Sequence, residues 1–174
     1  MRKVSIIVTC GEQQTQLRQL LPQLLSLRYG GEYEVIVVDK MHDKDLEEWL
    51  EDMEVQHSCL NHTFCPASSR GIDIQRLALT LGAKAANYEW LVILPVDVKL
   101  PSEDWLLDLT KCCSDEVGVV IGLTKRKSRW NWFRSIFRRN FSVFNPTSSI
   151  ILCSRNILFQ SQTIKLSNCH IVKL

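Results

Sequence analysis

Apolar positions along the chain follow two patterns that alternate. Four short runs of apolar, mostly β-branched residues are typical of strands covered on both faces, at 5–9, 34–38, 90–94 and 117–121. Stripes of apolar residues at the spacing of one helical face lie between or beside these runs, at 17–25, 46–53, 73–86 and 101–112. A further short strand is expected at 63–66. This alternation predicts an α/β fold with a mostly parallel sheet and helices on both of its faces.

Two residues mark where the predicted helices begin or bend. Pro22 lies inside the first leucine stripe, where its ring should kink the helix or mark its start. Asp43 is well placed to cap the second helix. The chain has no internal repeat and no evident linker, so a single domain is expected.

Polar residues follow three of the predicted strands, where ligands of parallel sheets bind. They are residues 9–12, then Asp39 and Lys40, and then residues 95–97. Asp39 and Asp97 each end a strand, and a carboxylate at that edge can contact a ligand. An aspartate after a strand is also a common turn former or helix cap. Both interpretations stay open for this pair.

Charge is distributed unevenly between the two parts of the chain. The net charge is +2 over 174 residues, but residues 1–116 carry a balance of −8 and residues 117–174 a balance of +10. This segregation indicates that the C-terminal third faces an anionic partner. No carboxylate follows Glu116, so none there can act as a base or bind a metal.

The chain's overall composition favours a cytoplasmic protein. No apolar run reaches the roughly 18 residues of a membrane-spanning helix, and the N-terminus lacks the apolar region of a secretory signal. The irregular spacing of the seven cysteines indicates reduced, mostly buried thiols. A zinc site remains a minor alternative, on His57, Cys59, His62 and Cys65.

Two blocks of sequence resemble a known family. The segments VSIIVTCGEQQTQLRQLLPQLLSLRY with EVIVVDK, and RLALTLGAKAANYEWLVILPVDVKLPSEDWL, resemble family 2 glycosyltransferases, most closely bacterial members of the Bacteroidetes type. The resemblance covers about residues 3–125. It implies a GT-A fold in which residues 1–124 form the nucleotide-sugar-binding half. Residues 125–174 are then expected to hold a basic aromatic helix and part of the acceptor half of the same domain, incomplete on the acceptor side.

The resemblance also implies a reaction and a set of site residues. Such enzymes transfer a hexose from a UDP or GDP sugar to a saccharide or lipid-linked acceptor, usually with Mg²⁺ or Mn²⁺ to neutralise the diphosphate leaving group. Asp97 matches the second aspartate of the metal motif, and Asp39 matches the contact to the nucleotide base. The other nucleotide-binding positions implied are Thr9, Cys10, Glu12 and Arg76.

The match departs from the family at positions that carry the chemistry. Pro95 stands where the first metal-binding aspartate is expected, so metal binding should be weak. The last third, where the family places its base, has no acidic residue, which leaves His170 as the only late group able to titrate near neutral pH. Poor turnover is therefore expected. Two alternatives stay open: an inactive or truncated remnant that binds nucleotide or a protein partner, and a basic module for membrane or RNA surfaces.

The basic segment at 126–144 has an aromatic helical face. Trp130, Phe133 and Phe137 recur at helical spacing. The segment's arginines lie mostly off that face, namely Arg129, Arg134, Arg138 and Arg139. Such a helix can lie on anionic lipid at the inner membrane face, or pack its aromatic face on the sheet. Binding to single-stranded RNA is the least favoured of the three interpretations.

Overall fold

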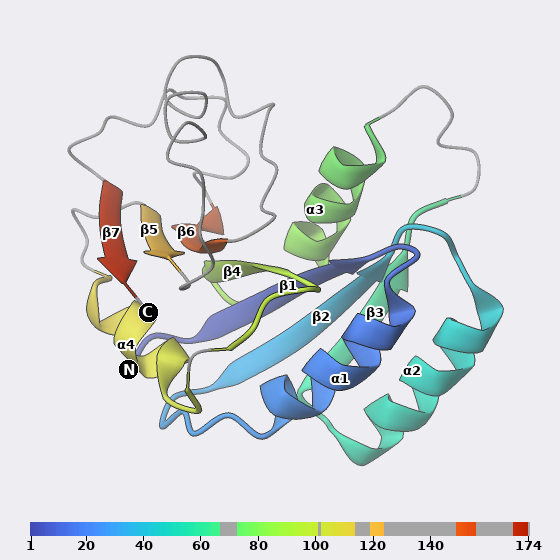
Figure 1. Cartoon of the computed structure of the whole chain (residues 1–174), viewed down its shortest axis with the longest axis horizontal. Helices are drawn as coiled ribbons and strands as arrows, with labels where there is room; N and C mark the ends of the chain where they lie inside the picture. Colours follow the sequence, from blue (N-terminus) through green and yellow to red (C-terminus); the bar gives the residue numbers. More distant parts are fainter. Residues whose placement is uncertain (67–72, 101, 114–118, 124–148, 156–168, 174) are drawn as a thin grey trace.

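The computed structural model describes residues 1–66, 73–100, 102–113, 119–123, 149–155 and 169–173. Four strand-helix pairs come first along the chain, and three strands follow (Figure 1). The elements are β1 (Val4–Cys10), α1 (Gln14–Leu25), β2 (Tyr33–Asp39), α2 (Lys44–Gln56), β3 (Leu60–Phe64), α3 (Ile74–Ala85), β4 (Trp90–Pro95), α4 (Trp105–Lys111), β5 (Val119–Leu123), β6 (Ser149–Ser154) and β7 (Cys169–Lys173).

Within the described residues the strands form one sheet in the order β3-β2-β1-β4-β6-β5-β7. The first four neighbours run parallel, β6 is antiparallel to β4 and β5, and β7 is parallel to β5. The predicted mostly parallel α/β sheet is therefore confirmed. Strands β6 and β7 were not predicted, and β3 and β5 are each displaced by two or three residues from the runs that predicted them.

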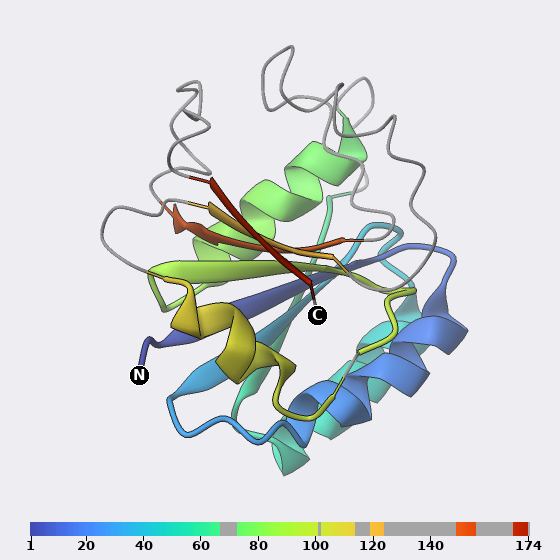
Figure 2. The ribbon, with the colours of Figure 1, turned by 60° about the vertical axis from the view of Figure 1, so that its left-hand side comes forward.

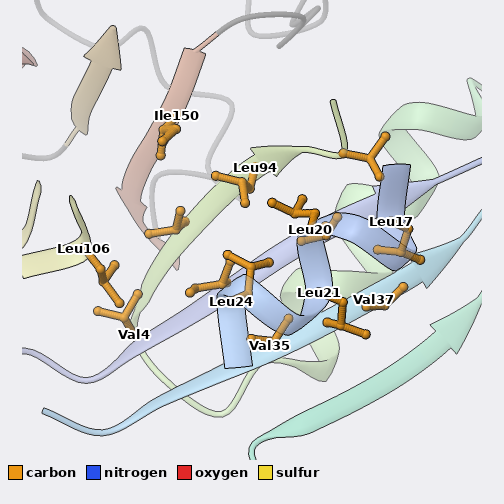
Figure 3. Packing of buried hydrophobic residues seen from close by; sticks show 14 of the residues in the cluster. Val4, Leu17, Leu20, Leu21, Leu24, Val35, Val37, Leu94, Leu106 and Ile150 are labelled. Carbon is orange, nitrogen blue, oxygen red and sulfur yellow. The ribbon is translucent and has the colours of Figure 1, made fainter. Parts of the chain in front are cut away.

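Helices cover both faces of the sheet, as predicted (Figures 1 and 2). Helices α1, α2 and α4 pack on one face, and α3 lies alone among the described helices on the other. Figure 3 shows the leucines of α1 against Val35 and Val37 of β2 and Leu94 of β4. Successive strand residues point to opposite faces, so Val37 packs under α1 while Val38 packs under α3.

The observed helix ends agree only in part with those predicted from the sequence. Asp43 caps α2 as predicted, because its carboxylate accepts a hydrogen bond from the Leu46 N–H at 3.0 Å. Helix α1 runs from Gln14 through Pro22, so Pro22 does not mark its start. Helix α4 begins at Trp105, after Asp104, so residues 102–104 of the predicted range 101–112 lie before it. None of the described helices is both long and apolar enough to cross a bilayer.

A buried carboxylate ties three segments together at the amino-terminal edge of the sheet. Glu34 of β2 is only 5% exposed, and Ser5 of β1 lies opposite it in the register. Glu34 accepts hydrogen bonds from the Ser5 hydroxyl at 2.6 Å, from the Asn87 N–H at 2.6 Å and from the Asn87 side-chain amide at 2.7 Å. The Ser5 hydroxyl in turn accepts from the Tyr88 N–H. This cluster fixes the chain between α3 and β4.

Helix α3 approaches the sheet closely at Gly82. A Cβ atom at this position would lie 2.6 Å from Cγ2 of Ile7 and 3.1 Å from Cγ2 of Val38. Both neighbours are β-branched and fully buried, so neither can swing aside. Glycine is therefore required by packing, although it is a poor helix former.

Replacing Gly82 with alanine is expected to destabilise the protein by about 1–2 kcal/mol, because overpacking outweighs the gain in helix propensity. Denaturant unfolding of the variant measures this difference. Lys84→Ala, at an exposed position of the same helix, is the control and should change stability by less than about 0.5 kcal/mol. An unchanged or increased stability of Gly82→Ala would show that the helix can shift away from the sheet at no cost.

Candidate functional site

Three parallel strands end side by side at the edge where the sequence predicts a ligand. In the register of the sheet, Cys10 of β1 lies beside Asp39 of β2, and Thr9 lies beside Pro95 of β4. The start of α3 reaches the same edge, since the Gln75 side chain donates a hydrogen bond to the Thr9 hydroxyl at 3.1 Å. Three strands and the start of α3 thus meet at one edge of the sheet.

Asp39 is buried, and its carboxylate organises the loop that follows β2. One oxygen accepts from the Met41 N–H at 2.9 Å and the other from the Asp43 N–H at 2.6 Å. In the same loop His42 has a φ of 53°, the left-handed conformation, and its ring stacks on Phe64 with centroids 3.8 Å apart. The turn-forming interpretation of Asp39 is therefore confirmed. A contact between Asp39 and a nucleotide base stays a prediction.

Cys10 lies beside Asp39 but is not a reactive thiol. Burial, followed by the negative charge of Asp39, raises the pKa of Cys10 to about 11. The thiol therefore stays protonated near neutral pH, where a nucleophile would need the thiolate. Its Sγ lies 3.4 Å from the Gly11 carbonyl oxygen, to which it donates. Cys10 can contribute backbone contacts to a ligand, as the resemblance implies, but no covalent chemistry.

The remaining nucleotide-binding candidates lie at the rim. Glu12 is exposed in the turn between β1 and α1. Arg76 is exposed in the first turn of α3, and Asp73 caps that turn by accepting from the Gln75 and Arg76 N–H groups. Both positions lie at the edge of the sheet that carries the strand ends.

Sequence reasoning missed a chain of hydrogen bonds at the centre of this edge. Gln75 donates to Thr9, and its side-chain oxygen accepts from the Lys40 ammonium at 3.1 Å. The signal for Lys40 was its place directly after the strand-end aspartate. The signal for Gln75 was its place just inside a capped helix, but nothing in the local pattern indicates that this helix reaches β1.

The strand ends do not fit a divalent cation held by two protein carboxylates. Asp97 is exposed in the loop after β4, and Pro95 has no ligand atom in its side chain. The Pro95 carbonyl accepts from the Val98 N–H at 3.2 Å. Among the described residues, neither Asp97 nor Asp39 belongs to any group of three side chains with ligand atoms close enough to share an ion.

The described residues contain such a group elsewhere. Glu47 and Glu51 of α2 and His62 of β3 place ligand atoms within 4.8 Å of one another. His62 Nδ1 also lies 2.8 Å from the carboxylate of Glu54, which is not part of this group. Exposed acidic groups commonly gather in this way without an ion. The group does not include the cysteines of the zinc alternative, so the described residues give that alternative no support.

Two sets of candidates lie outside what the structure describes. The membrane-surface candidates all fall within residues 124–148, which are not described: Arg129, Trp130, Phe133, Arg134, Phe137, Arg138 and Arg139. The backbone of His170 lies in β7 beside Val120 of β5. Its side chain is not described.

No protein-family model and no curated protein matches this chain. Solved structures do match. The mannosyltransferase PcManGT from Pyrobaculum calidifontis, in complex with GDP-Man and Mn²⁺, is 21% identical with a TM-score of 0.66, over 90% of this chain and 46% of that one. Residues 1–349 of TarS from S. aureus are 16% identical with a TM-score of 0.66, over 98% of this chain and 58% of that one.

A third match is glucosyl-3-phosphoglycerate synthase from Mycobacterium tuberculosis, in complex with Mn²⁺, UDP and glucosyl-3-phosphoglycerate. It is 16% identical with a TM-score of 0.67, over 99% of this chain and 70% of that one. The chain spans about half the length of the first two structures. At these identities the likeness concerns the fold, and it confirms the expected one: the chain has the GT-A fold of nucleotide-sugar glycosyltransferases.

Proposed function

We propose that the chain binds a nucleoside diphosphate sugar, of the UDP or GDP type, at the carboxyl ends of β1, β2 and β4. The proposal extends to a family 2 glycosyltransferase that transfers a hexose to a saccharide or lipid-linked acceptor. The observation that carries it is the polar edge of a GT-A sheet, where Thr9, Gln75 and Lys40 are joined by hydrogen bonds beside the buried Asp39.

The site residues take their proposed roles from their positions at this edge. In this proposal Thr9 and Cys10 contact the nucleotide through the backbone where β1 ends. Asp39, which holds the neighbouring loop, is assigned to the contact with the base. Arg76 and Glu12 lie at the exposed rim. We assign Arg76 the role of contacting the donor phosphates. Solved structures with this fold carry GDP-Man, UDP-GlcNAc and UDP, which supports the UDP or GDP class.

A second candidate function is nucleotide binding without transfer. Its specific support is Pro95 in place of a metal-binding carboxylate, together with the lack of any acidic residue after Glu116. The acceptor half assigned to residues 125–174 stays a proposal. So does contact of its basic segment with the inner membrane face.

Calorimetric titration with UDP, GDP and their nucleosides tests the site. We expect a diphosphate to bind, and Arg76→Met to weaken its binding by about three- to tenfold because a cation near the phosphates is lost. Lys84→Met removes the same charge from the exposed far end of the described helix α3 and should leave binding unchanged. No binding at millimolar concentration by a folded protein would contradict the proposal. A transfer assay with the donor sugar then separates the two candidates.

A further inference from the structure

We infer that the Lys40 ammonium takes over the role of the divalent cation at this edge, so that the chain binds the diphosphate of a nucleotide without a metal. The inference rests on the proposed nucleotide site. It goes beyond that site by naming the group that neutralises the phosphates and by predicting independence from metal ions.

The Lys40 side chain is directed from β2 across the end of β1. Its backbone N–H donates to the Cys10 carbonyl at 2.8 Å, which fixes the start of the side chain beyond the last paired residues. Its Cε lies 3.2 Å, and its Nζ 3.5 Å, from where a Cβ atom on Gly11 would be. The glycine therefore leaves the space that the lysine occupies. The ammonium therefore lies beside the turn that follows β1.

A neutral side chain holds the ammonium in place. Gln75 accepts from Lys40 at 3.1 Å while it donates to Thr9 at 3.1 Å, so β1, β2 and α3 together fix the position of Nζ. Within the described part of the chain, no carboxylate forms an ion pair with Lys40. The oxygens of the adjacent Asp39 accept from the Met41 and Asp43 N–H groups.

This arrangement suits an anion at the strand ends. An ammonium has three donors, and the amide of Gln75 accepts only one of them. Because that partner is neutral, the positive charge of Lys40 is not cancelled by a hydrogen-bonded carboxylate. Lysine binds phosphate as a point charge, and a cation fixed in advance stabilises a diphosphate leaving group as its charge develops. Pro95 stands where the resemblance implies a metal-binding carboxylate, and Lys40 supplies a positive charge nearby. Both features agree with a site that binds a diphosphate without a metal.

Titration of UDP and GDP in EDTA and in Mn²⁺ tests the inference on the unmodified chain. We expect the two dissociation constants to agree within about twofold, whereas a metal-dependent site would differ by tenfold or more. Lys40→Met is expected to weaken binding of the diphosphate by about tenfold or more, and to leave binding of the nucleoside unchanged. Lys40→Arg, which keeps the charge, should retain most of the affinity.

Lys44→Met is the matched control, because Lys44 is exposed at the start of α2 and has the same charge. Thermal unfolding of each variant verifies the fold, and the EDTA comparison needs no variant at all. Binding that requires Mn²⁺, or a folded Lys40→Met variant that binds UDP and GDP as the unmodified chain does, would overturn the inference and leave the proposed nucleotide site standing. Failure of every nucleotide to bind would overturn both.

Discussion

Replacing Glu34 with leucine is expected to lower the free energy of unfolding by about 2–4 kcal/mol, because several hydrogen bonds to a buried carboxylate are lost at once. Leucine fills a similar volume but offers no acceptor. The Ser5 hydroxyl is fully buried and donates to Glu34, so it would be left without its acceptor in the apolar interior. The Asn87 N–H and side-chain amide would lose theirs as well, and the chain that leads into β4 would be held less firmly.

Chemical denaturation monitored by circular dichroism measures this effect. Glu34→Gln keeps one acceptor oxygen and should show an intermediate loss. Glu32→Leu is the matched control, because Glu32 is exposed and its ion pair with Lys3 at 2.7 Å lies at the surface. That substitution should change stability by less than about 1 kcal/mol. If Glu34→Leu were as stable as the unmodified chain, the hydrogen bonds of Glu34 would contribute nothing to the stability of the fold.

The Glu34 cluster lies at the edge of the sheet opposite the candidate site, so nucleotide binding by the folded variant should be unaffected.

Strands β1, β2 and β4 could be predicted because they are buried on both faces. The runs at 5–9, 34–38 and 90–94 are mostly apolar, with Ser5, Thr9 and Glu34 as exceptions, and they lie within β1, β2 and β4. Strand β6 was not predicted, although Ile150, Ile151, Leu152 and Cys153 form a similar run. Its place between β4 and β5 depends on antiparallel pairing with strands that lie far away along the chain. Local periodicity carries no information about such pairing.

The candidate site could be predicted only as far as strand ends determine it. Asp39 and Pro95 lie at the ends of predicted strands, and parallel pairing brings them to one edge. The contact of Gln75 with Thr9 depends on how closely α3 packs. Gln75 and Gly82 are seven residues apart, which is nearly two turns, so they share one face of the helix. Gly82 allows that face to approach β1 closely, and the same face carries Gln75 to the strand end.

Replacing Pro95 with aspartate is expected to make nucleotide binding depend on metal. The substitution places a second carboxylate two residues before Asp97, where β4 ends. Divalent cations such as Mn²⁺ prefer hard oxygen ligands, and two carboxylates with the donor phosphates can supply them. We expect the variant to bind UDP at least about tenfold more tightly in Mn²⁺ than in EDTA. The added carboxylate gives Mn²⁺ a second protein ligand, which is sufficient for an effect of this size.

The same variant is not expected to transfer sugar efficiently, because an added metal ligand does not supply a base. General base catalysis contributes about 10²- to 10⁴-fold, and no carboxylate follows Glu116 in the sequence. Calorimetry with UDP and a transfer assay with the donor sugar measure the two effects separately. Pro95→Asn, which adds a neutral oxygen, and the double variant Pro95→Asp with Asp97→Asn should both lose most of the response to Mn²⁺. Robust, Asp97-dependent transfer by the unmodified chain would contradict this account, and the proton of the acceptor would then have to pass to a group such as His170 or a phosphate of the acceptor.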